Sequence, residues 1–306
     1  MLSHLFATVV FSLLVSGCAE GAPSRANAEP ATVAARAHSG PALWVVKDPD
    51  TTIYLFGTVH MLPQGFAWRN AAFDKAFDSA DTLVMEVVGV ENSAETQPAI
   101  MKIGFTPGLP KLAERVPADA RDDLAAAIKH AGVPATALDP METWLATMTL
   151  STARIVRLGY GIDSGVESEL KARATTQRKR VEGLETVEEQ LSFFDTLPED
   201  EQRKLLVLSL DDMDAIQKII DTAVKDWAAG DVDKVAAVLE EDIKSSPQLA
   251  KRLLADRNAN WAEWIDKRLK TTPGTVFVAV GTGHLAGAES VQAKLKAKGI
   301  AAERLN

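Results

Sequence analysis

Two histidines each follow a short apolar run that ends in glycine, and no other pattern in the chain is better suited to chemistry. The segments TTIYLFGTVH and TVFVAVGTGH end in His60 and His284, and both have Gly, Thr and one spacer before the histidine. About 0.3 G-x-x-H matches are expected by chance at this composition, so two with the same threonine and a strand before them indicate a shared role. We expect both imidazoles to face one polar site at the carboxyl ends of neighbouring strands.

Glu86 is the third candidate, because it interrupts the apolar run TLVMEVV at residues 82–88. A carboxylate inside a buried strand is costly unless it is paired, bound to a cation or near the strand end. If the strand before His60, the following helix and the strand of Glu86 form one right-handed βαβ unit, the two residues lie on adjacent parallel strands at the same edge. A salt bridge from Glu86 to an arginine is the alternative.

Two histidines and a carboxylate on three strand ends suit a divalent ion with open positions for water and substrate. Such an ion activates water and polarises carbonyl groups, which is hydrolytic chemistry. Two alternatives stay open. In the first, His60 is a metal-free general base, Glu86 orients it and Arg257 stabilises the developing oxyanion. In the second, the loops are plain strand-end turns of a non-catalytic ligand-binding protein.

The elements that must position these residues come from both chain ends. Residues 42–46 and 52–56 flank KDPD, a composition that predicts a hairpin turn, while residues 275–280 and 300–305 supply the later strands. Helical periodicity dominates about residues 91–270. The predicted class is α/β (α+β), a central mixed sheet with a large helical insertion. The repeated order of strand, GTxH loop, helix and strand suggests a diverged internal repeat.

Four residues in the insertion have local explanations. Asp163 follows a glycine-rich hinge at a natural N-cap position. Thr186 and Glu189 form the two ends of a capping box, after a short strand-like piece at residues 181–186. His130 near a helix C-terminus is explained by the helix dipole. The sequence allows the side chain of Glu185 to point either into the cleft that would hold the two histidines or into water.

The charge balance argues against a nucleic-acid partner. The chain of 306 residues has a formal net charge of -9, whereas phosphate binding rests on clustered Lys and Arg. We expect a peptide or small-molecule substrate.

The first residues resemble an export signal, with an apolar run at residues 5–15 followed by VSGC. This resembles a lipobox, so residues 1–17 are predicted to be cleaved and Cys18, the single cysteine, to be lipidated. Residues 18–40 are then a tether and residues 41–306 the folded domain. The expected location is the bacterial envelope, as an outer-membrane lipoprotein facing the periplasm. The alternative is an ordinary cleaved signal with an incidental cysteine, since residues 1–4 contain no Lys or Arg.

The paired G-x-x-H loops, the strand acid Glu86, the segment VEGLETVEEQ and the pair Arg257 and Asn258 together resemble the TraB/GumN family, which is related to the TIKI proteins. The resemblance covers residues 42–306 and implies an EreA/ChaN-like fold. In the TIKI branch it implies a manganese- or cobalt-dependent peptidase, with zinc also possible. Carried over, it makes His60, Glu86 and His284 ligands or catalytic groups, supported by Arg257 and Asn258. Other branches of the clan hydrolyse a macrolide ester with a histidine base or bind haem.

Overall fold

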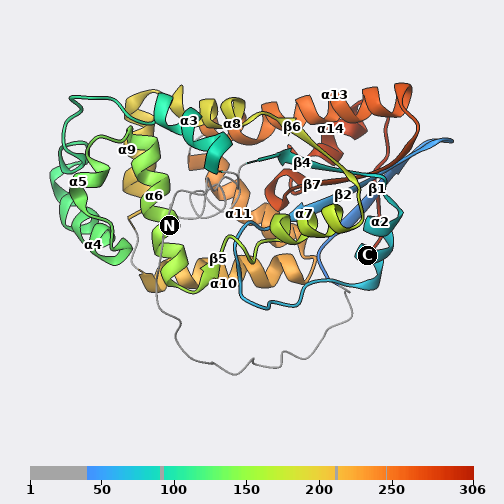
Figure 1. Ribbon diagram of the computed structural model, residues 1–306, viewed down its shortest axis with the longest axis horizontal. Helices are drawn as coiled ribbons and strands as arrows, with labels where there is room; N and C mark the ends of the chain where they lie inside the picture. Colours follow the sequence, from blue (N-terminus) through green and yellow to red (C-terminus); the bar gives the residue numbers. More distant parts are fainter. Residues whose placement is uncertain (1–39, 90–92, 211–212, 246) are drawn as a thin grey trace.

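The structure is a computed structural model that describes residues 40–89, 93–210, 213–245 and 247–306. A mixed β-sheet runs through the molecule with helices on both faces, and a mostly helical region extends from one end of it (Figure 1). The predicted α/β class with a central mixed sheet is therefore confirmed. The strands are β1 (Leu43–Lys47), β2 (Thr51–Thr58), β3 (Leu62–Pro63), β4 (Thr82–Val87), β5 (Tyr160–Gly161), β6 (Arg180–Glu185), β7 (Gly274–Gly281) and β8 (Glu303–Arg304).

Helices fill most of the chain between β4 and β7, as the periodicity predicted. The α-helices are α2 (Ala71–Ser79), α3 (Ser93–Ile103), α4 (Arg121–Ala131), α5 (Ala135–Leu138), α6 (Thr143–Arg157), α7 (Val166–Thr176), α8 (Val187–Asp195), α9 (Glu199–Leu208), α10 (Met213–Ala228), α11 (Val232–Ser245), α12 (Pro247–Ala250), α13 (Asp256–Thr271) and α14 (Val291–Ala297). A π-helical segment, Lys251–Ala255, joins α12 to α13. Short 3-10 turns occur at Leu112–Glu114, Ala118–Ala120 and Thr282–Leu285.

The six-stranded sheet has the order β6-β4-β7-β2-β1-β8. Strands β6, β4, β7 and β2 run parallel, and β1 is antiparallel to both β2 and β8. The prediction that the strands of His60 and Glu86 are neighbours was wrong, because β7 is inserted between β2 and β4. All three strands still end at one edge of the sheet, so their exit loops meet there.

The sheet is not built from the chain ends alone. Strand β6 comes from the middle of the predicted insertion and pairs in parallel with β4, from Thr82 opposite Arg180 to Val87 opposite Glu185. The strand-like piece predicted at residues 181–186 is therefore an edge strand of the main sheet. This places Glu185 at the same carboxyl edge as Glu86.

The sheet has a separate hydrophobic core on each face, because successive side chains of a strand point to opposite faces. On β7, Phe277 and Ala279 pack with helices α2, α6 and α7, while Val276 and Val278 pack under α13 and α14. Both faces of the central strands are apolar and buried, as expected for parallel strands covered by helices.

Two of the three turn and helix-cap predictions agree with the structure. The hairpin turn between β1 and β2 is confirmed, with the Asp48 carboxylate accepting from the backbone N–H of Thr51 at 2.8 Å. The capping box at the start of α8 is also confirmed. Asp163 is not an N-cap, because α7 starts later and Gly165 occupies that position.

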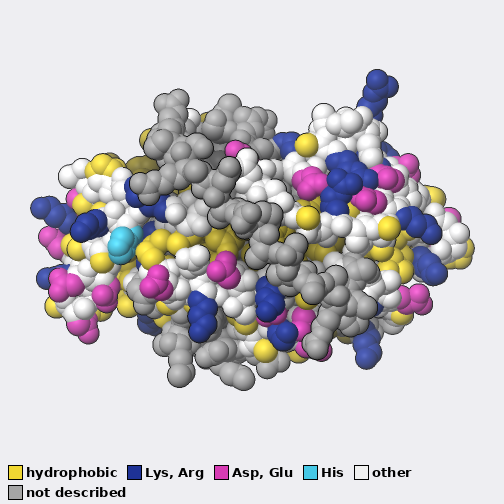
Figure 2. All heavy atoms as spheres, turned by 90° about the horizontal axis from the view of Figure 1, so that it is seen from below, with side chains coloured by type: hydrophobic (Ala, Val, Ile, Leu, Met, Phe, Trp, Pro, Cys, Tyr) yellow, Lys and Arg dark blue, Asp and Glu magenta, His cyan; other side chains and the backbone are white. Residues whose placement is uncertain are grey.

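The predicted signal segment 1–17, the lipidation site Cys18 and all of the tether except residue 40 lie outside the described residues. None of the helices in the described part of the chain is long and apolar enough to cross a membrane. On the face drawn in Figure 2, basic and acidic side chains lie among one another on both sides of the grey atoms, and hydrophobic side chains are visible between them.

Candidate functional site

The two G-x-x-H loops lie in direct contact at the carboxyl edge of the sheet. In the parallel pairing of β2 and β7, Thr58 is opposite Gly281. A Cβ atom added to Gly57 would lie 2.9 Å from Oγ1 of Thr282 and 3.1 Å from its Cα. A side chain at position 57 would force Thr282 to shift, so glycine suits this close approach of the two loops. The glycine of the first motif therefore makes room for the threonine of the second.

Glu86 is buried at the end of β4 and is bound through both oxygens. Oε1 accepts from the backbone N–H of Gly281 at 2.6 Å, and Oε2 accepts from Nη2 of Arg257 at 2.6 Å. Gln190 of α8 adds a longer contact of 3.4 Å to Oε2. Burial is the largest single effect and disfavours the charged carboxylate, but the charge of Arg257, the nearby histidines and the N–H of Gly281 together outweigh it and lower the pKa of Glu86 to about 2. The salt bridge to an arginine, considered above as the alternative, is what the structure contains.

Arg257 lies at the centre of the site, and its side chain is 1% exposed. Five contacts occupy all five of its N–H groups. Nε and Nη2 donate to the two oxygens of Glu185 at 2.8 Å each, and Nη2 also donates to Glu86. Nη1 donates to the carbonyl of Leu253 at 3.2 Å and to Nε2 of His284 at 3.0 Å. In this arrangement Arg257 has no N–H left for the oxyanion role that was hypothesised for it.

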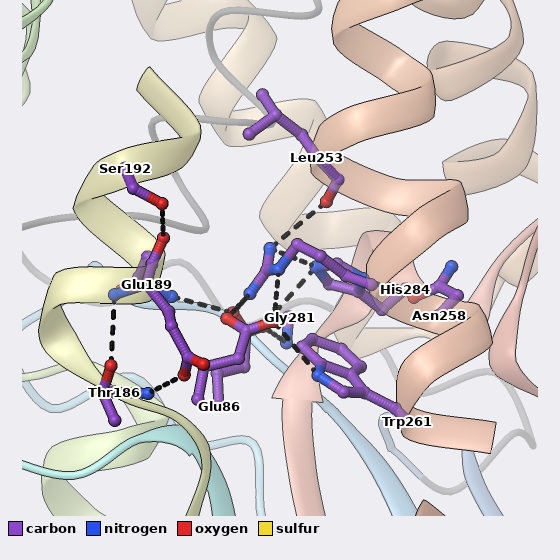
Figure 3. Close-up of polar contacts among 12 residues, drawn as sticks. Glu86, Thr186, Glu189, Ser192, Leu253, Asn258, Trp261, Gly281 and His284 are labelled. Carbon is purple, nitrogen blue, oxygen red and sulfur yellow. Dashed lines mark hydrogen bonds and ion pairs between the residues drawn. The ribbon is translucent and has the colours of Figure 1, made fainter. Parts of the chain in front are cut away.

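The surroundings of His284 determine which of its nitrogens carries the proton (Figure 3). Because a guanidinium can only donate, Nε2 must accept from Arg257. Nδ1 lies 2.6 Å from Oδ1 of Asn258, whose Nδ2 donates to the carbonyl of Glu289 at 2.7 Å, so Nδ1 is the protonated nitrogen. Burial, together with the charge of Arg257, lowers the pKa of His284 to about 3. His284 is therefore a neutral imidazole whose lone pair is already engaged.

The π-helical segment before α13 delivers Arg257 to this position. Leu253 lies within that segment, and its carbonyl accepts a hydrogen bond from the guanidinium of Arg257. Single π turns inside α-helices are rare and are frequently found at functional sites. Trp261, one turn later, donates from Nε1 to Glu185 at 3.1 Å and packs on the ring of His284.

Glu185 thus points into the site and not into water. Burial raises its pKa, although its hydrogen bonds with Arg257 oppose that rise. Two carboxylates share one guanidinium here, so the buried cluster has one negative charge in excess whenever both acids are ionised and His284 is neutral. The sequence left open whether Glu185 points into the site or into water. The signal that could have placed it in the site is the segment VEGLETVEEQ, which contains it and carries part of the family resemblance.

His60 lies on the exit loop of β2 and is paired with a residue that the sequence did not single out. Its Nδ1 is 2.8 Å from Oε1 of Glu167 in the first turn of α7, with 19% and 18% of the two side chains exposed. The loop and helix are locked together, since the N–H of Val166 donates to the carbonyl of Val59 at 3.0 Å. A Cβ atom on Gly165 would lie 2.0 Å from the carbonyl oxygen of His60.

The structure brings the predicted residues to one edge. Nε2 of His284 is 3.7 Å from Oε1 of Glu86. The charge of His60 contributes to lowering the pKa values of both groups, so His60 is within electrostatic range of them. Asn258 contacts His284 through Oδ1 and donates from Nδ2 to the carbonyl of Glu289.

This donor set does not fit a divalent ion as it stands. The lone pair of His284 Nε2 faces a guanidinium, and both oxygens of Glu86 already accept charged or backbone donors. An ion at this point would have to displace Arg257, which two carboxylates hold in place. Within the described ranges, no three His, Cys, Asp or Glu side chains are grouped closely enough to hold an ion. The manganese, cobalt or zinc site stays a prediction.

Comparisons with known proteins agree with the resemblance of the motifs. The sequence model described as the TraB/PrgY/gumN family matches residues 42–304. A relative from Escherichia coli K12, named uncharacterized protein YbaP, is 24% identical over 250 residues, which are 82% of this chain and 90% of that protein. The protein of the same name from Shigella flexneri matches with the same identity and coverage. No solved structure matches the chain.

Proposed function

Because this chain belongs to the TraB/PrgY/gumN family and holds the imidazole of His60 beside the carboxylate of Glu167, we propose that it is a hydrolase in which His60 activates water. The observation that carries the proposal is the distance of 2.8 Å between Nδ1 of His60 and Oε1 of Glu167. A carboxylate at Nδ1 favours the tautomer with its proton on that nitrogen. Nε2 then has the lone pair that a general base needs, but this atom is buried, so water reaches it only when the His60 loop moves.

In the proposed reaction Nε2 of His60 removes a proton from water as the oxygen attacks an acyl carbon, and the imidazolium returns that proton to the leaving group. Glu167 lies at ion-pair distance from Nδ1, so its charge stabilises the protonated form of the ring, which is part of the role of the third member of a catalytic triad. Glu86, Arg257 and His284 are positioning residues. They tie the ends of β4 and β7 together through Gly281 and so hold the second loop against the first.

A carboxylic ester is the substrate class that this chemistry suits best, because an alkoxide leaves more readily than the amide anion of a peptide and needs less help from an acid or an electrophile. The competing proposal is the metal-dependent peptidase implied by the family resemblance. Its support is the convergence of Glu86 and His284 at 3.7 Å, with His60 within electrostatic range. It requires Arg257 to release His284 first.

The proposal is tested by assaying the full chain against panels of small carboxylic esters and short peptides. His60→Ala is expected to lower kcat by about 10²–10⁴, the range for loss of a general base. Glu167→Gln should also lower kcat, because an amide no longer selects the tautomer. The matched control is Glu169→Gln, since Glu169 is on the same helix but pairs with Arg69 at the surface. Turnover that survives His60→Ala, or no turnover of any panel member, would overturn the proposal.

We also propose that the protein is an envelope lipoprotein attached through Cys18, on the strength of the VSGC segment. The test is labelling with a palmitate analogue in cells. Label in the wild-type chain that is lost in Cys18→Ser supports the anchor, whereas an unlabelled wild-type chain refutes it.

A further inference from the structure

A groove lies beside Arg257 between α8 and the continuous stretch from α12 to α13. Its volume is about 380 Å³, within the range of about 300–1,000 Å³ that ligand sites occupy. It is open to solvent, and its wall includes Phe193, Gln248, Lys251, Arg252, Arg257 and Asn260. Neither the family resemblance nor the proposed reaction assigns a role to it.

The charges around the groove are mostly positive, although the chain as a whole has a net charge of -9. Lys251, Arg252 and Arg257 face one acid, Asp256. Asp256 is paired with Lys251 at 2.5 Å, but both side chains are more than half exposed, so this pair is weak and can be opened by a ligand. The charge of Arg257 is already balanced from behind by Glu86 and Glu185.

Arg252 is the cation whose charge is not balanced. Its Nη1 and Nη2 donate to neutral oxygens at the end of α8, the carbonyls of Thr196 and Ser192 and the hydroxyl of Thr196. Within the described part of the chain, no carboxylate pairs with it. These bonds use three of its five N–H groups, all of Nη2 included. Nε–H and the remaining hydrogen of Nη1 point to different sides of the guanidinium, so either one can donate a single charge-assisted hydrogen bond to an anion at the groove.

The other side chains of the groove wall are suited to bind an amide group adjacent to the anion. Phe193 contributes an aromatic ring to the wall, and the guanidinium carbon of Arg257 lies 5.3 Å from the centre of that ring. Gln248 and Asn260 each offer both a donor and an acceptor, the complement of a peptide unit. We infer that this groove binds the C-terminal end of a peptide, with the carboxylate at Arg252 and Lys251 and the last amide and side chain between Phe193 and the two side-chain amides.

This inference does not depend on hydrolysis, so we test it by calorimetric titration of the full chain. The probes are N-acetylphenylalanine, its C-terminal amide, and acetate. The acid is expected to bind saturably, and the amide and acetate at least tenfold more weakly. Equal binding of acid and amide would show that no carboxylate is recognised. Equal binding of acetate would show a general anion site. Either result, or no binding of the acid, overturns the inference.

Variants then locate the site. Arg252→Gln should weaken binding of the acid at least tenfold and leave the weak binding of the amide unchanged. Lys251→Gln changes an exposed side chain and should not disturb packing. It therefore tests the site even if Arg252→Gln loosens the end of α8. We expect Lys251→Gln to weaken binding of the acid several-fold. The control is Lys204→Gln, an exposed lysine on α9 that pairs with Glu201. Unchanged affinity in both Arg252→Gln and Lys251→Gln would refute the assignment.

Discussion

Nη1 of Arg257 lies 3.0 Å from Nε2 of His284, and this contact fixes the protonation state of the imidazole. A guanidinium cannot accept a hydrogen bond, so the histidine must be neutral with its proton on Nδ1. The second motif histidine is therefore part of a buried, fully paired cluster, whereas the first, His60, is partly exposed and paired with Glu167. Two histidines in matching motifs have different environments, and we assign them different roles.

The first prediction concerns the titration of His284. Its folded pKa of about 3 is below the ordinary value of 6.5, so the unfolded chain binds a proton that the folded chain does not between these pH values. Stability from this group is complete above pH 6.5 and falls toward pH 3, with a slope of at most about 1.4 kcal/mol per pH unit. Nitrogen-15 NMR should show one protonated Nδ1 that does not titrate between pH 5 and 8.

A variant separates this effect from other acid-sensitive groups. Glu86 loses stability in the same direction, but below its ordinary pKa of 4.5, so the window from pH 6.5 to 4.5 reports mainly on histidine. His284→Gln cannot titrate, and the slope of unfolding free energy in that window should become shallower than in the wild-type protein. An unchanged slope would contradict the assignment.

The second prediction concerns removal of the central charge. Arg257→Gln leaves Glu86 and Glu185 buried without their partner, and breaking such a pair costs about 3–5 kcal/mol. Arg257→Lys keeps the charge but cannot make five fixed hydrogen bonds, so it should be intermediate. Urea unfolding measures both. The control is Arg203→Gln, which breaks an exposed pair with Glu199 and should change stability by less than about 1 kcal/mol. Similar losses in Arg257→Gln and Arg203→Gln would show that the buried cluster contributes no special stability.

The sequence predicted the site better than it predicted the order of the strands. The pairing of glycine, threonine and histidine after two apolar strands located both loops, and the lone acid in an apolar strand identified Glu86. The strand order could not be read locally, because β7 (Gly274–Gly281) enters between β2 and β4 from near the other end of the chain. Glu167 was missed for the same reason, since nothing in its own helix distinguishes it from other surface acids.

The third prediction concerns the contact between α7 and the His60 loop. In Gly165→Ala the new Cβ atom meets the carbonyl oxygen of His60 at 2.0 Å, so the helix and the loop must separate. Because Gly165 has a φ of -66°, any residue can adopt its backbone, and the effect is purely steric. We expect a loss of about 1–3 kcal/mol in unfolding free energy, the range for overpacking, and a lower kcat as Glu167 moves from His60.

The control for that variant is Asp163→Ala. Asp163 is exposed and does not cap α7, so its removal should change neither stability nor kcat. A loss of stability in Asp163→Ala as large as in Gly165→Ala would mean that the hinge, and not the steric contact, determines the result.

The fourth prediction tests the contact between the two motifs. Gly57→Ala should destabilise the protein by roughly 1–3 kcal/mol, because its Cβ atom would meet Oγ1, Cβ and Cα of Thr282 at 2.9–3.1 Å. Thr282→Gly removes two of these atoms, and the double variant should recover part of the loss. Strictly additive losses in a double-mutant cycle would show that the loops do not touch.

The most direct test of the account is the metal requirement of hydrolysis. The full chain is stripped with a chelator, its manganese, cobalt and zinc contents are measured, and ester turnover is compared before and after stripping in the wild-type protein and in His60→Ala. We predict that the stripped wild-type protein keeps its turnover and that His60→Ala has lost it. Turnover that disappears on stripping and returns with stoichiometric manganese or cobalt would contradict the general-base mechanism and support the metal site.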